Sequence, residues 1–556
     1  LLLAVIGYGV LDVNPRVLAA GVFRRGRVAM HDDYEVVMHV DGRTATVTVS
    51  HDTEREGYFS LYTNGKPDAS VQVLRWPEGR KPSEGPYLAG DEPTQLLLAI
   101  VPLLARPDAR NVATIGMGSG VTSHVLLASP TLERLDTVEI EPNMAAGAKM
   151  FAPINERVFN DPRSHIIFDD AKAYFAAAEA SYDLIVSEPS NPWVAGVSSL
   201  FTVEFYQEIS RYMAPDGLLG QWMHGYELSD PLLLSVLAAV DREFPDYRLY
   251  RVGDRDWLIL AAREDDGIGK LHAEPLTQWP DLASDAKLLG ITKLDQIDSL
   301  LVATDELIHP YLATVEPNRD THPILDNGAE RARFFRESAE ALLELRFIPL
   351  PLIEVFGAWP QPSYSTRISD QRSDKHVLDE PERALLLMRM FENDDRQNHA
   401  GGGAMVSYLG AHDNLGLFEG RVPVEIADAW FDAVYSVYHE SAPWIDLAPT
   451  KFWSEVVASG TADRVGERMA NQIALLDAVV HRRGAQLRAL AQTEIAAGDS
   501  HLHPRFLALA GAMGLVLDGA SAAERRAFAE ASMRPQLGGQ ASNDIAYAMI
   551  VAWMEA

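Results

Sequence analysis

Residues 111–142 read NVATIGMGSGVTSHVLLASPTLERLDTVEIEP, which has the order of a strand, a glycine-rich turn, a helix and a second strand that ends in acid. An apolar run leads into Gly116, Gly118 and Gly120, where missing side chains let backbone N–H groups approach a ligand at the start of a helix. Glu139 follows Gly120 by 19 residues, a spacing that suits a carboxylate accepting the two hydroxyls of a ribose. The pattern predicts a nucleotide-binding unit formed by these four residues. The alternative is a tight turn followed by a solvated acid.

The size and charge of the chain limit the classes of protein to which it can belong. Its 556 residues exceed what one hydrophobic core supports, and the length suggests about three or four domains. With 48 basic and 79 acidic residues, the formal charge of −31 repels nucleic acid phosphates and anionic lipids. We therefore expect no nucleic acid partner and favour cationic substrates. The chain has no cysteine, which excludes disulfides, thiolate zinc sites and cysteine nucleophiles.

A small antiparallel β-hairpin domain is predicted at residues 31–90. Apolar and polar residues alternate around a turn at Asp41-Gly42, which is typical of a β-hairpin. A second pair of strands is indicated around Asn64-Gly65. The two hairpins together predict a sheet that precedes the nucleotide-binding unit.

Strands and helices alternate through residues 91–265, which we assign as the catalytic domain. A helical periodicity comes first, at 92–105. Six strand candidates follow, at 111–115, 135–140, 164–168, 183–187, 217–222 and 256–262. The alternation predicts an α/β fold with a mainly parallel, Rossmann-like sheet of the methyltransferase type, covered by helices on both faces.

Helical periodicity dominates the rest of the chain. We expect a helical extension and loop at 266–345 and an α-helical domain at 346–556, without a convincing fixed-period repeat. A polar segment at 317–327 is a candidate lid for the site, although most polar loops are only surface. His501 and His503 have no third ligand nearby in the sequence, so we interpret them as polar surface and predict no metal.

The first residues of the chain contain an apolar run at 1–11 that is too short to span a bilayer, which needs about 20 residues. The basic residues Arg24, Arg25 and Arg27 follow it and favour a cytoplasmic face. We expect residues 1–30 to be the end of a truncated membrane segment or a linker. The alternative is a buried strand or helix of the folded domain.

Acidic and polar residues follow the later strands of the predicted sheet, at the edge where ligands bind open α/β sheets. Asp170 comes after the third strand, where its carboxylate can accept from an adenine amino group or cap the next helix, and we favour adenine. The fourth strand ends in EPSNPW at 188–193, whose two prolines predict a rigid loop. Glu188 is therefore the best-placed general base, and we expect Trp193 to form a wall of the pocket.

The order of these motifs resembles the spermidine synthase (polyamine aminopropyltransferase) family. The matching features are the glycine motif, VEIE at 138–141, DD at 169–170, YDLIVSEPSNP at 182–192 and SLFTVEFYQEISRYMAPDGLLGQW at 199–222. The resemblance covers about 55–265 and extends to a bacterial branch in which such a domain is fused behind a multipass membrane segment. It implies a protein tethered to the cytoplasmic face of the inner membrane by a missing N-terminal segment.

The resemblance also implies an activity. The family's ribose-binding acid matches Glu139, its adenine-binding acid matches Asp170 and its catalytic aspartate matches Glu188. In that family the catalytic acid accepts a proton from, or holds, an attacking primary amine, which displaces methylthioadenosine from decarboxylated S-adenosylmethionine. Such a substitution requires alignment of the amine and its deprotonation. No tightly bound cofactor is implied, because the sulfonium compound is a co-substrate.

Three parts of the family pattern differ in this chain. The family's glycine loop usually carries an aspartate that grips the aminopropyl ammonium, and Ser119 stands at that position. A neutral hydroxyl forms no charge-assisted bond with an ammonium and does not repel a carboxylate. The second aspartate of the family's DSxDP loop is Asn191, and its tyrosine-histidine/glutamine-glutamate stretch matches Thr94, Gln95 and Leu96. The nucleoside half of the site is therefore retained, whereas the half that selects the donor and the amine is rebuilt.

The expected site combines these residues. We expect Glu188 and Asn191 to be catalytic. The donor is expected to contact Gln95, Gly116, Gly118, Ser119, Gly120, Glu139 and Asp170. The amine is expected to contact Trp193, Gln221, His224, Tyr226 and Glu227.

These differences leave three functions open. The first is an aminopropyltransferase that moves its alkyl group from decarboxylated S-adenosylmethionine to an amine. The second is an enzyme that uses intact S-adenosylmethionine, as methyl donor or in another reaction at the sulfonium, and Ser119 favours it. The third is a non-catalytic nucleotide-binding sensor. We favour the first, with a small-molecule amine as substrate, a homo-oligomeric protein, and neither metal nor redox cofactor.

Overall fold

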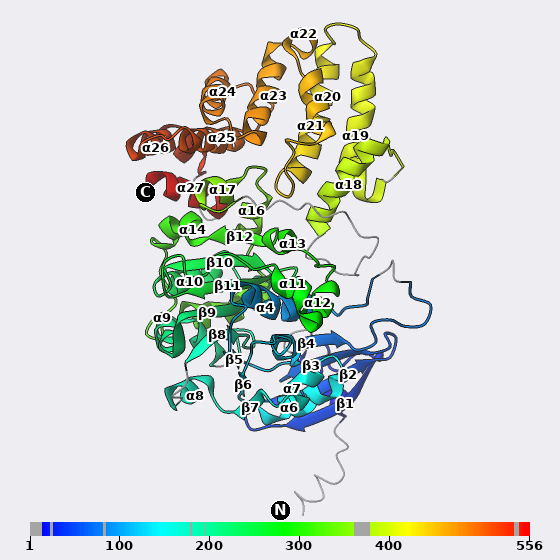
Figure 1. The fold of residues 1–556 in the computed structure, drawn as a ribbon, viewed down its shortest axis with the longest axis vertical. Helices are drawn as coiled ribbons and strands as arrows, with labels where there is room; N and C mark the ends of the chain where they lie inside the picture. Colours follow the sequence, from blue (N-terminus) through cyan, green and yellow to red (C-terminus); the bar gives the residue numbers. More distant parts are fainter. Residues whose placement is uncertain are drawn as a thin grey trace, which may run out of the picture.

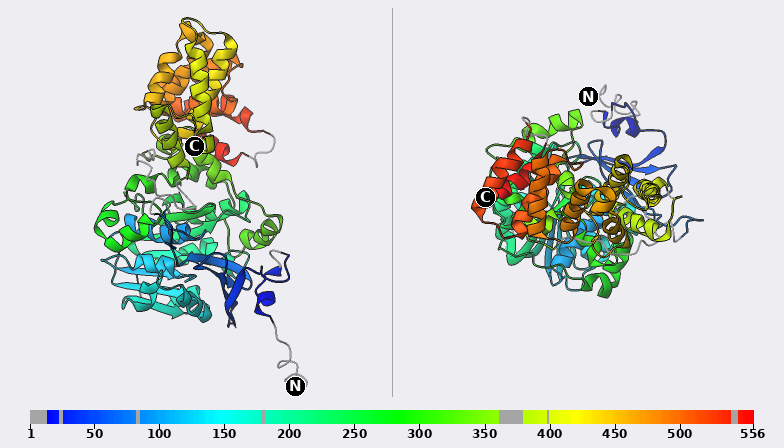
Figure 2. Two further views of the ribbon diagram at one scale, coloured as in Figure 1. Left: turned by 90° about the vertical axis from the view of Figure 1, so that its right-hand side faces the viewer. Right: turned by 90° about the horizontal axis from the view of Figure 1, so that it is seen from above.

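The molecule, described here from a computed structural model, has three parts: a small N-terminal sheet, an α/β part and a group of C-terminal helices. Residues 14–22, 26–81, 85–177, 181–194, 196–360, 379–397, 399–538 and 544–556 are described. The group of C-terminal helices lies at one end of the longest axis, and the N-terminal sheet lies beside the α/β part at the other end (Figure 1). The left view of Figure 2 shows the N-terminal sheet alongside the α/β part from another side.

The N-terminal residues contribute little described structure. The apolar run at 1–11 and the basic residues Arg24 and Arg25 lie outside the described residues, and α2 spans Pro15–Leu18. Within the ranges given above, no helix is both long and apolar enough to cross a membrane. The membrane tether and the homo-oligomer therefore stay predictions.

The N-terminal sheet consists of two hairpins. Its strands are β1 (Tyr34–Asp41), β2 (Thr46–Asp52), β3 (Tyr58–Thr63) and β4 (Lys66–Gln72), paired antiparallel in that order. The second turn is the predicted Asn64-Gly65 pair, with φ of 51° and 78°. Positive φ at both central residues is typical of the tight turn that matches the twist of paired strands.

The central sheet has eight strands. They are β5 (Asn111–Ile115), β6 (Arg134–Glu139), β7 (Ser164–Phe168), β8 (Tyr182–Ser187), β9 (Met213–His224), β10 (Asp246–Arg251), β11 (Asp256–Ala262) and β12 (Leu301–Thr304). Their order across the sheet is β12-β10-β11-β9-β8-β5-β6-β7. The pairs from β7 to β9 are parallel, and β11, β10 and β12 join antiparallel at the other edge. The chain leaves β5 toward β6 on one side and later returns to β8 on the other, which creates the switch point where such sheets bind ligands.

The predicted α/β class is confirmed, and all six predicted strands are present. β10 and β12 are additional strands. β10 carries the charged residues Asp246 and Arg248, which are buried because each has a partner. Asp246 accepts a hydrogen bond from the Ile268 N–H (2.8 Å), and the Arg248 guanidinium lies 3.9 Å from the ring centroid of Trp359. β12 has four residues, too few for a periodic signal, and it extends the sheet beyond the expected boundary at 265.

Helices cover both faces of the central sheet. They are α4 (Glu92–Ala105), α5 (Val121–Leu126), α6 (Pro142–Ala148), α7 (Glu156–Asn160), α8 (Ala171–Ala177), α9 (Val203–Ile209), α10 (Asp230–Asp241), α11 (Glu274–Gln278) and α12 (Pro280–Lys287). In Figure 1, α8, α9 and α10 lie on one side and α4, α11 and α12 on the other. All residues of α4 are buried, and it packs against β8, β9 and β11. This central position brings its first turn to the edge of the sheet where the parallel strands end.

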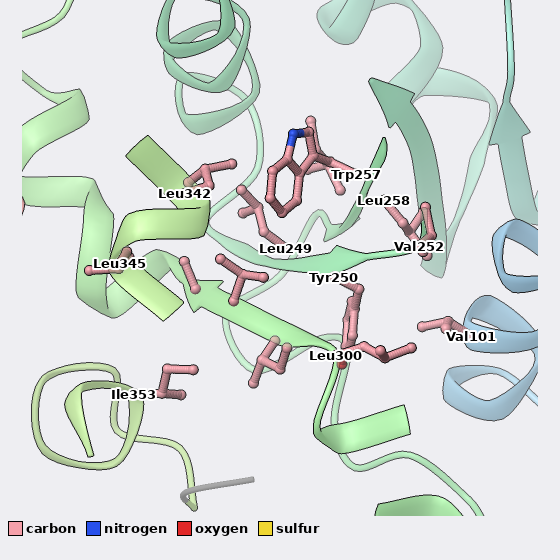
Figure 3. Close-up of a cluster of buried hydrophobic side chains, with 14 of the residues drawn as sticks. Val101, Leu249, Tyr250, Val252, Trp257, Leu258, Leu300, Leu342, Leu345 and Ile353 are labelled. Carbon is pink, nitrogen blue, oxygen red and sulfur yellow. The ribbon is translucent and has the colours of Figure 1, made fainter. Parts of the chain in front are cut away.

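A buried hydrophobic cluster joins the sheet to the helical part of the chain. The connecting helices are α13 (Leu294–Asp298), α14 (Asp305–Leu312), α15 (Ile324–Phe335), α16 (Ala341–Phe347) and α17 (Leu352–Phe356). Figure 3 shows Leu249 and Trp257 of the antiparallel strands near Leu342 and Leu345 of α16 and Ile353 of α17. All five side chains are buried. The antiparallel edge of the sheet is therefore covered by the helices that follow it.

The described residues after 378 form helices. They are α18 (Asp379–Asn393), α19 (His399–Gly416), α20 (Val424–Ser441), α21 (Lys451–Ser459), α22 (Ala462–Val465), α23 (Glu467–Val480), α24 (Gly484–Ala497), α25 (Pro504–Leu517), α26 (Ala522–Phe528) and α27 (Ile545–Glu555). The predicted helical C-terminal region is confirmed. The last helix, α27, packs against α14 and α16, so the end of the chain returns to the α/β part.

Glu141 holds the N-terminal sheet against the central sheet. It caps α6, where its Oε1 accepts from the Asn143 N–H (3.1 Å). Its Oε2 accepts from the Thr44 N–H (2.8 Å), the Thr44 hydroxyl (2.9 Å) and the Ala45 N–H (3.3 Å) in the loop between β1 and β2. Burial opposes the charge of Glu141, but these hydrogen bonds outweigh it and lower the pKa below its usual range. The ionised carboxylate therefore acts as the joint between the two sheets.

Replacement Glu141→Ala is expected to loosen that joint. It removes the acceptor of five hydrogen bonds, one of them from Asn143 Nδ2 (2.8 Å), so we expect a loss of about 3 kcal/mol in the free energy of unfolding and faster limited proteolysis within residues 31–72. Denaturant unfolding and timed proteolysis measure both effects. Glu156→Ala, in the exposed first turn of α7, is the matched control. Equal behaviour of the two variants would contradict the assigned role.

Candidate active site

A cavity of about 320 Å³ lies between the N-terminal sheet and the carboxyl ends of the parallel strands. Its wall includes β4, the first turn of α4 and the loops that follow β5, β6, β7 and β8. This is the switch point of the sheet. The expected site residues that line the cavity are Gln95, Gly116, Gly118, Ser119, Glu139, Asp170, Glu188, Asn191 and Tyr226.

Glu139 stands at the end of β6 with its carboxylate oriented by the backbone. Its Oε2 accepts from the Met117 N–H and its Oε1 from the Glu141 N–H, both at 2.9 Å. The residue is 5% exposed, and burial raises the pKa of its carboxyl above the usual range although the two N–H groups act in the opposite direction. Each oxygen keeps a second lone pair with which it can accept a ligand hydroxyl.

The glycine loop brings the ends of β5 and β8 together. A Cβ atom on Gly116 would lie 2.3 Å from the Glu188 carbonyl oxygen, so only glycine fits there. Gly120 does not line the cavity; it precedes α5 as its N-cap, with φ of 80°. The glycines therefore shape the loop and position Glu188, besides admitting a ligand.

Ser119 is bound within the protein. Its hydroxyl donates to Gln95 Oε1 (2.7 Å) and accepts from the Val121 N–H (3.2 Å). Its carbonyl oxygen accepts from Asn155 Nδ2 (2.7 Å). The serine thus connects the glycine loop to the first turn of α4 and brings no negative charge to the cavity.

Asp170 caps a helix, which was the alternative to adenine binding at this position. Its Oδ1 accepts from the Ala173 N–H (3.0 Å) in the first turn of α8, so it caps that helix. The side chain is also exposed and lines the cavity. A capping carboxylate can still accept from a ligand, and the adenine contact stays a prediction.

Glu188 lies at the end of β8, as expected, with its carboxyl in the cavity wall. Its Oε2 accepts from the Thr122 hydroxyl (2.6 Å). Burial raises the pKa of Glu188 to about 7, although the Thr122 bond lowers it, and the negative charges of Asp256 and Asp91 raise it further. A carboxylate with this pKa can accept a proton near neutral pH.

Asp256 is a second acid of this kind, and sequence reasoning missed it. Its Oδ2 accepts from the Thr94 hydroxyl (2.9 Å) and its Oδ1 from Trp222 Nε1 (3.2 Å). Burial raises its pKa to about 7, opposed by the Thr94 bond, and Asp91 raises it further. Asp256 begins β11, and its register partner is His224, the last residue of β9. Ligands are expected at the carboxyl ends of parallel strands. Strand β11 is antiparallel and begins at that edge, so this expectation does not point to its first residue.

Asn191 and Tyr226 both line the cavity and contact each other. Asn191 Nδ2 donates to the Tyr226 hydroxyl at 3.4 Å. Asn191 is 1% exposed, and its Oδ1 is buried with no hydrogen-bond partner among the described residues. The loop after β8 therefore carries an acceptor without a partner among the described residues as well as an acid, and both residues line the cavity.

Four other expected amine contacts lie outside the cavity wall. Trp193, Gln221, His224 and Glu227 do not line it. Trp193 packs edge-to-face on His224, with ring centroids 4.9 Å apart, and Gln221 Nε2 donates to the Trp222 carbonyl (2.9 Å). Gln221 and His224 are fully buried. These side chains support the wall formed by Trp222 and Tyr226, and direct contact with an amine stays a prediction.

Residues of β4 close the cavity from the side of the N-terminal sheet. Lys66 forms a buried ion pair with Asp68, which also accepts from the Ser190 hydroxyl (2.7 Å). The sequence motif NGKPDAS at 64–70 carries these residues. They connect the small sheet to the loop that holds Glu188.

The predicted lid at 317–327 flanks the cavity without lining it. Asp320 lies 3.7 Å from the ammonium of Lys172, a residue of the cavity wall. Asp326 accepts from the Ser198 hydroxyl (2.9 Å) in the segment that follows the loop after β8. The lid role stays a prediction.

The two histidines near the C-terminus have structural partners. His501 Nε2 lies 3.2 Å from Asp428, and His503 Nδ1 accepts from the Arg505 N–H (3.2 Å) as the cap of α25. Across the described part of the chain, no group of three or more potential ligands is arranged to hold a metal ion. Both histidines are therefore explained by local contacts.

Comparison with known proteins finds a shared domain. Residues 93–252 match the family model of the Spermine/spermidine synthase domain. The polyamine aminopropyltransferase of Alkaliphilus oremlandii is 32% identical over 123 residues, which are 22% of this chain and 43% of that protein. Putrescine N-methyltransferase 2 of Nicotiana tabacum is 30% identical over 141 residues, which are 24% of this chain and 40% of that protein. The chain thus spans less than half the length of these relatives.

A solved structure is also similar. The crystal structure of spermidine synthase from Thermotoga maritima has 18% sequence identity and a TM-score of 0.35, covering 44% of this chain and 78% of that one. Glu139, Asp170 and Glu188 fall inside the matched segment, whereas Asp256 lies beyond it. Residues 93–252 of this chain are thus similar to the spermine/spermidine synthase domain.

Proposed function

We propose that this protein transfers an aminopropyl group from decarboxylated S-adenosylmethionine to an amine and releases methylthioadenosine. The observation that carries the proposal is the position of Glu188, a half-buried carboxyl in the same cavity as Glu139. One acid suits the ribose of an adenosyl compound and the other suits deprotonation of a nucleophile. The match of residues 93–252 to the spermine/spermidine synthase domain supports the same reaction class.

The charge of the cavity favours cationic reactants. Eight carboxyl-bearing residues line it, against two lysines. Lys66 pairs with Asp68, and Lys172 lies near Asp320, so their charges are offset locally. A sulfonium donor and an ammonium-bearing acceptor are therefore both attracted, because the uncompensated charge is negative.

The donor would lie along the ends of β5 and β6. Glu139 would accept from the ribose hydroxyls, and Asp170 from the adenine amino group. Gln95 and the glycine loop would flank the sulfonium arm, since both line the cavity beside Ser119. The reactive carbon would then face the loop that carries Glu188.

The chemical step is a substitution at carbon. The acceptor enters as an ammonium and gives one proton to Glu188, which frees the nitrogen lone pair. The nitrogen attacks the aminopropyl carbon next to sulfur, the C–S bond breaks, and the sulfonium becomes the neutral thioether of methylthioadenosine. Asn191 Oδ1 can accept an N–H of the amine and help to align it, because the oxygen is buried without a partner among the described residues.

Methyl transfer from intact S-adenosylmethionine to an amine is the second candidate. Ser119 brings no charge to repel the carboxylate of that donor. The similarity to Putrescine N-methyltransferase 2 adds support, because it is of the same order as the similarity to the aminopropyltransferase. The same amine pocket would serve both reactions.

The nucleoside product separates these candidates. With each donor and a panel of amines, we expect methylthioadenosine from the decarboxylated donor, identified by mass spectrometry. Glu188→Gln is expected to lower kcat by about 100-fold or more while nucleoside affinity is retained, since it removes the proton acceptor. S-adenosylhomocysteine as the product would establish methyl transfer. Nucleoside binding without any turnover would instead favour the sensor.

The pH dependence of kcat/KM tests the role of Glu188 independently. Because its pKa is raised to about 7, the base is protonated below that pH, and kcat/KM should fall up to tenfold per pH unit. This acid limb belongs to Glu188 and Asp256 together, since both have a pKa raised to about 7. In Glu188→Gln we expect kcat/KM to be lower at every pH and the acid limb to become shallower, because only Asp256 then titrates near 7. An acid limb of unchanged steepness and midpoint in this variant would assign the base elsewhere.

Ser119→Asp tests selection of the donor. A carboxylate at this position of the cavity wall should attract the ammonium of the decarboxylated donor and repel the carboxylate of the intact one. We expect the ratio of the two affinities, measured by calorimetry, to shift toward the decarboxylated donor by about tenfold or more. Ser119→Ala is the neutral control and should leave the ratio within about twofold. An unchanged ratio in Ser119→Asp would place the donor tail away from the glycine loop.

A further inference from the structure

We propose that Asp256 is a second ammonium-binding carboxylate of the active site and holds the amine together with Glu188 and Asp91. The inference rests on the proposed function, because it assumes that the cavity receives an amine. It adds a binding residue from β11, a strand that begins after the segment matched by the spermine/spermidine synthase domain.

The carboxyl of Asp256 is held in the cavity wall by neutral donors. The Thr94 hydroxyl and Trp222 Nε1 each donate to one of its oxygens, and all three residues line the cavity. A Cβ on Gly253 would lie 2.5 Å from Thr94 Oγ1 and 2.7 Å from Asp256 Oδ2. The bond between Thr94 and Asp256 therefore depends on a glycine at 253.

The charged groups that act on Asp256 are negative. Asp91 and Asp254 both disfavour its ionised form, and the effect of Asp91 extends to Glu188. The two lysines of the cavity wall are engaged with Asp68 and Asp320. A carboxylate in such surroundings becomes stable by taking up a proton or by binding a cation. An ammonium ion supplies the cation.

An independent observation indicates that the ligand carries N–H groups. The side chain of Asn191, 1% exposed, lines the same cavity, and its Oδ1 is buried with no acceptor bond formed among the described residues. A buried acceptor without a donor costs free energy until a ligand provides one. An alkylammonium has both the charge that Asp256 needs and the N–H groups that Asn191 Oδ1 needs.

Asp256 and Glu188 then have different tasks in the same step. Glu188 takes one proton from the entering ammonium, and Asp256 stays ionised. When the nitrogen forms its bond to carbon and the C–S bond breaks, positive charge returns to the nitrogen. Asp256 stabilises this new ammonium until the proton leaves with the product or to solvent. No additional reactant is needed for the proton balance.

The decisive experiment is calorimetric titration of putrescine into the full chain saturated with methylthioadenosine. Asp256→Asn should lower the putrescine affinity roughly 10- to 100-fold, because a charge-assisted contact is replaced by a neutral one. Methylthioadenosine affinity should stay within about twofold, because Asp256 lies away from Glu139, the acid expected to bind the ribose. In steady-state assays KM for the amine should rise more than kcat falls.

A matched control is available one strand away. Asp246→Asn alters a buried aspartate on β10, which accepts from the Ile268 N–H outside the cavity. It should leave both affinities unchanged. Thr94→Val keeps the charge of Asp256 and removes one of its two hydrogen-bond donors, so we expect a smaller loss of putrescine affinity. If Asp256→Asn does not fold, the putrescine affinity of Thr94→Val tests the role of Asp256 instead.

The possible results are distinguishable. Putrescine affinity that is unchanged in Asp256→Asn, with turnover intact, overturns the assignment of Asp256 and leaves the proposed function standing. A parent protein that binds methylthioadenosine but no amine overturns both. Equal losses of putrescine affinity in Asp256→Asn and Asp246→Asn would mean that both substitutions act only through the stability of the protein. This result would also overturn the inference.

Discussion

The ends of β5 and β8 are held together by a contact that only glycine permits, and the site depends on it. The Glu188 N–H donates to the Ile115 carbonyl, and the Gly116 N–H donates to the Val138 carbonyl, both at 2.9 Å. The first bond links the end of β5 to the loop after β8, and the second links it to β6. Because Gly116 has no Cβ, the Glu188 carbonyl can approach it closely. Glu139 and Glu188 thus face one cavity from opposite sides of the same strand.

Burial of negative charge around this contact determines what the cavity can bind. Glu141 accepts five hydrogen bonds, so its carboxylate is stable and serves as a structural joint. Glu188 has one hydrogen-bond donor, and Asp256 has two neutral donors and acidic neighbours. These two carboxyls are therefore poised to exchange a proton or to bind a cation. The same residue type has a structural or a chemical role according to the number and charge of its partners.

Several features of the site were predictable because they depend on local sequence. The glycine loop, the acid that ends β6 and the rigid loop after β8 each follow a strand that the alternation of elements predicts. Gly120 and Asp170, both expected to contact the donor, act at helix starts, and Gly120 does not line the cavity. In contrast, Trp193 and His224 pack against each other behind the wall, since the direction of a side chain depends on its tertiary neighbours. The bond between Ser119 and Gln95 likewise joins residues from elements that only folding brings together.

By itself, the sequence determined the α/β class, the six strands with recognisable patterns, and the two acids that follow β6 and β8, because each depends on short-range periodicity and turn chemistry. Only the tertiary structure decided that β10 and β12 extend the sheet, since charged Arg248 is buried by its contact with Trp359 and β12 is too short to recognise. It also decided that Asp256 belongs to the cavity. An antiparallel strand begins where its parallel neighbour ends, and that register arises from pairing between β9 and β11.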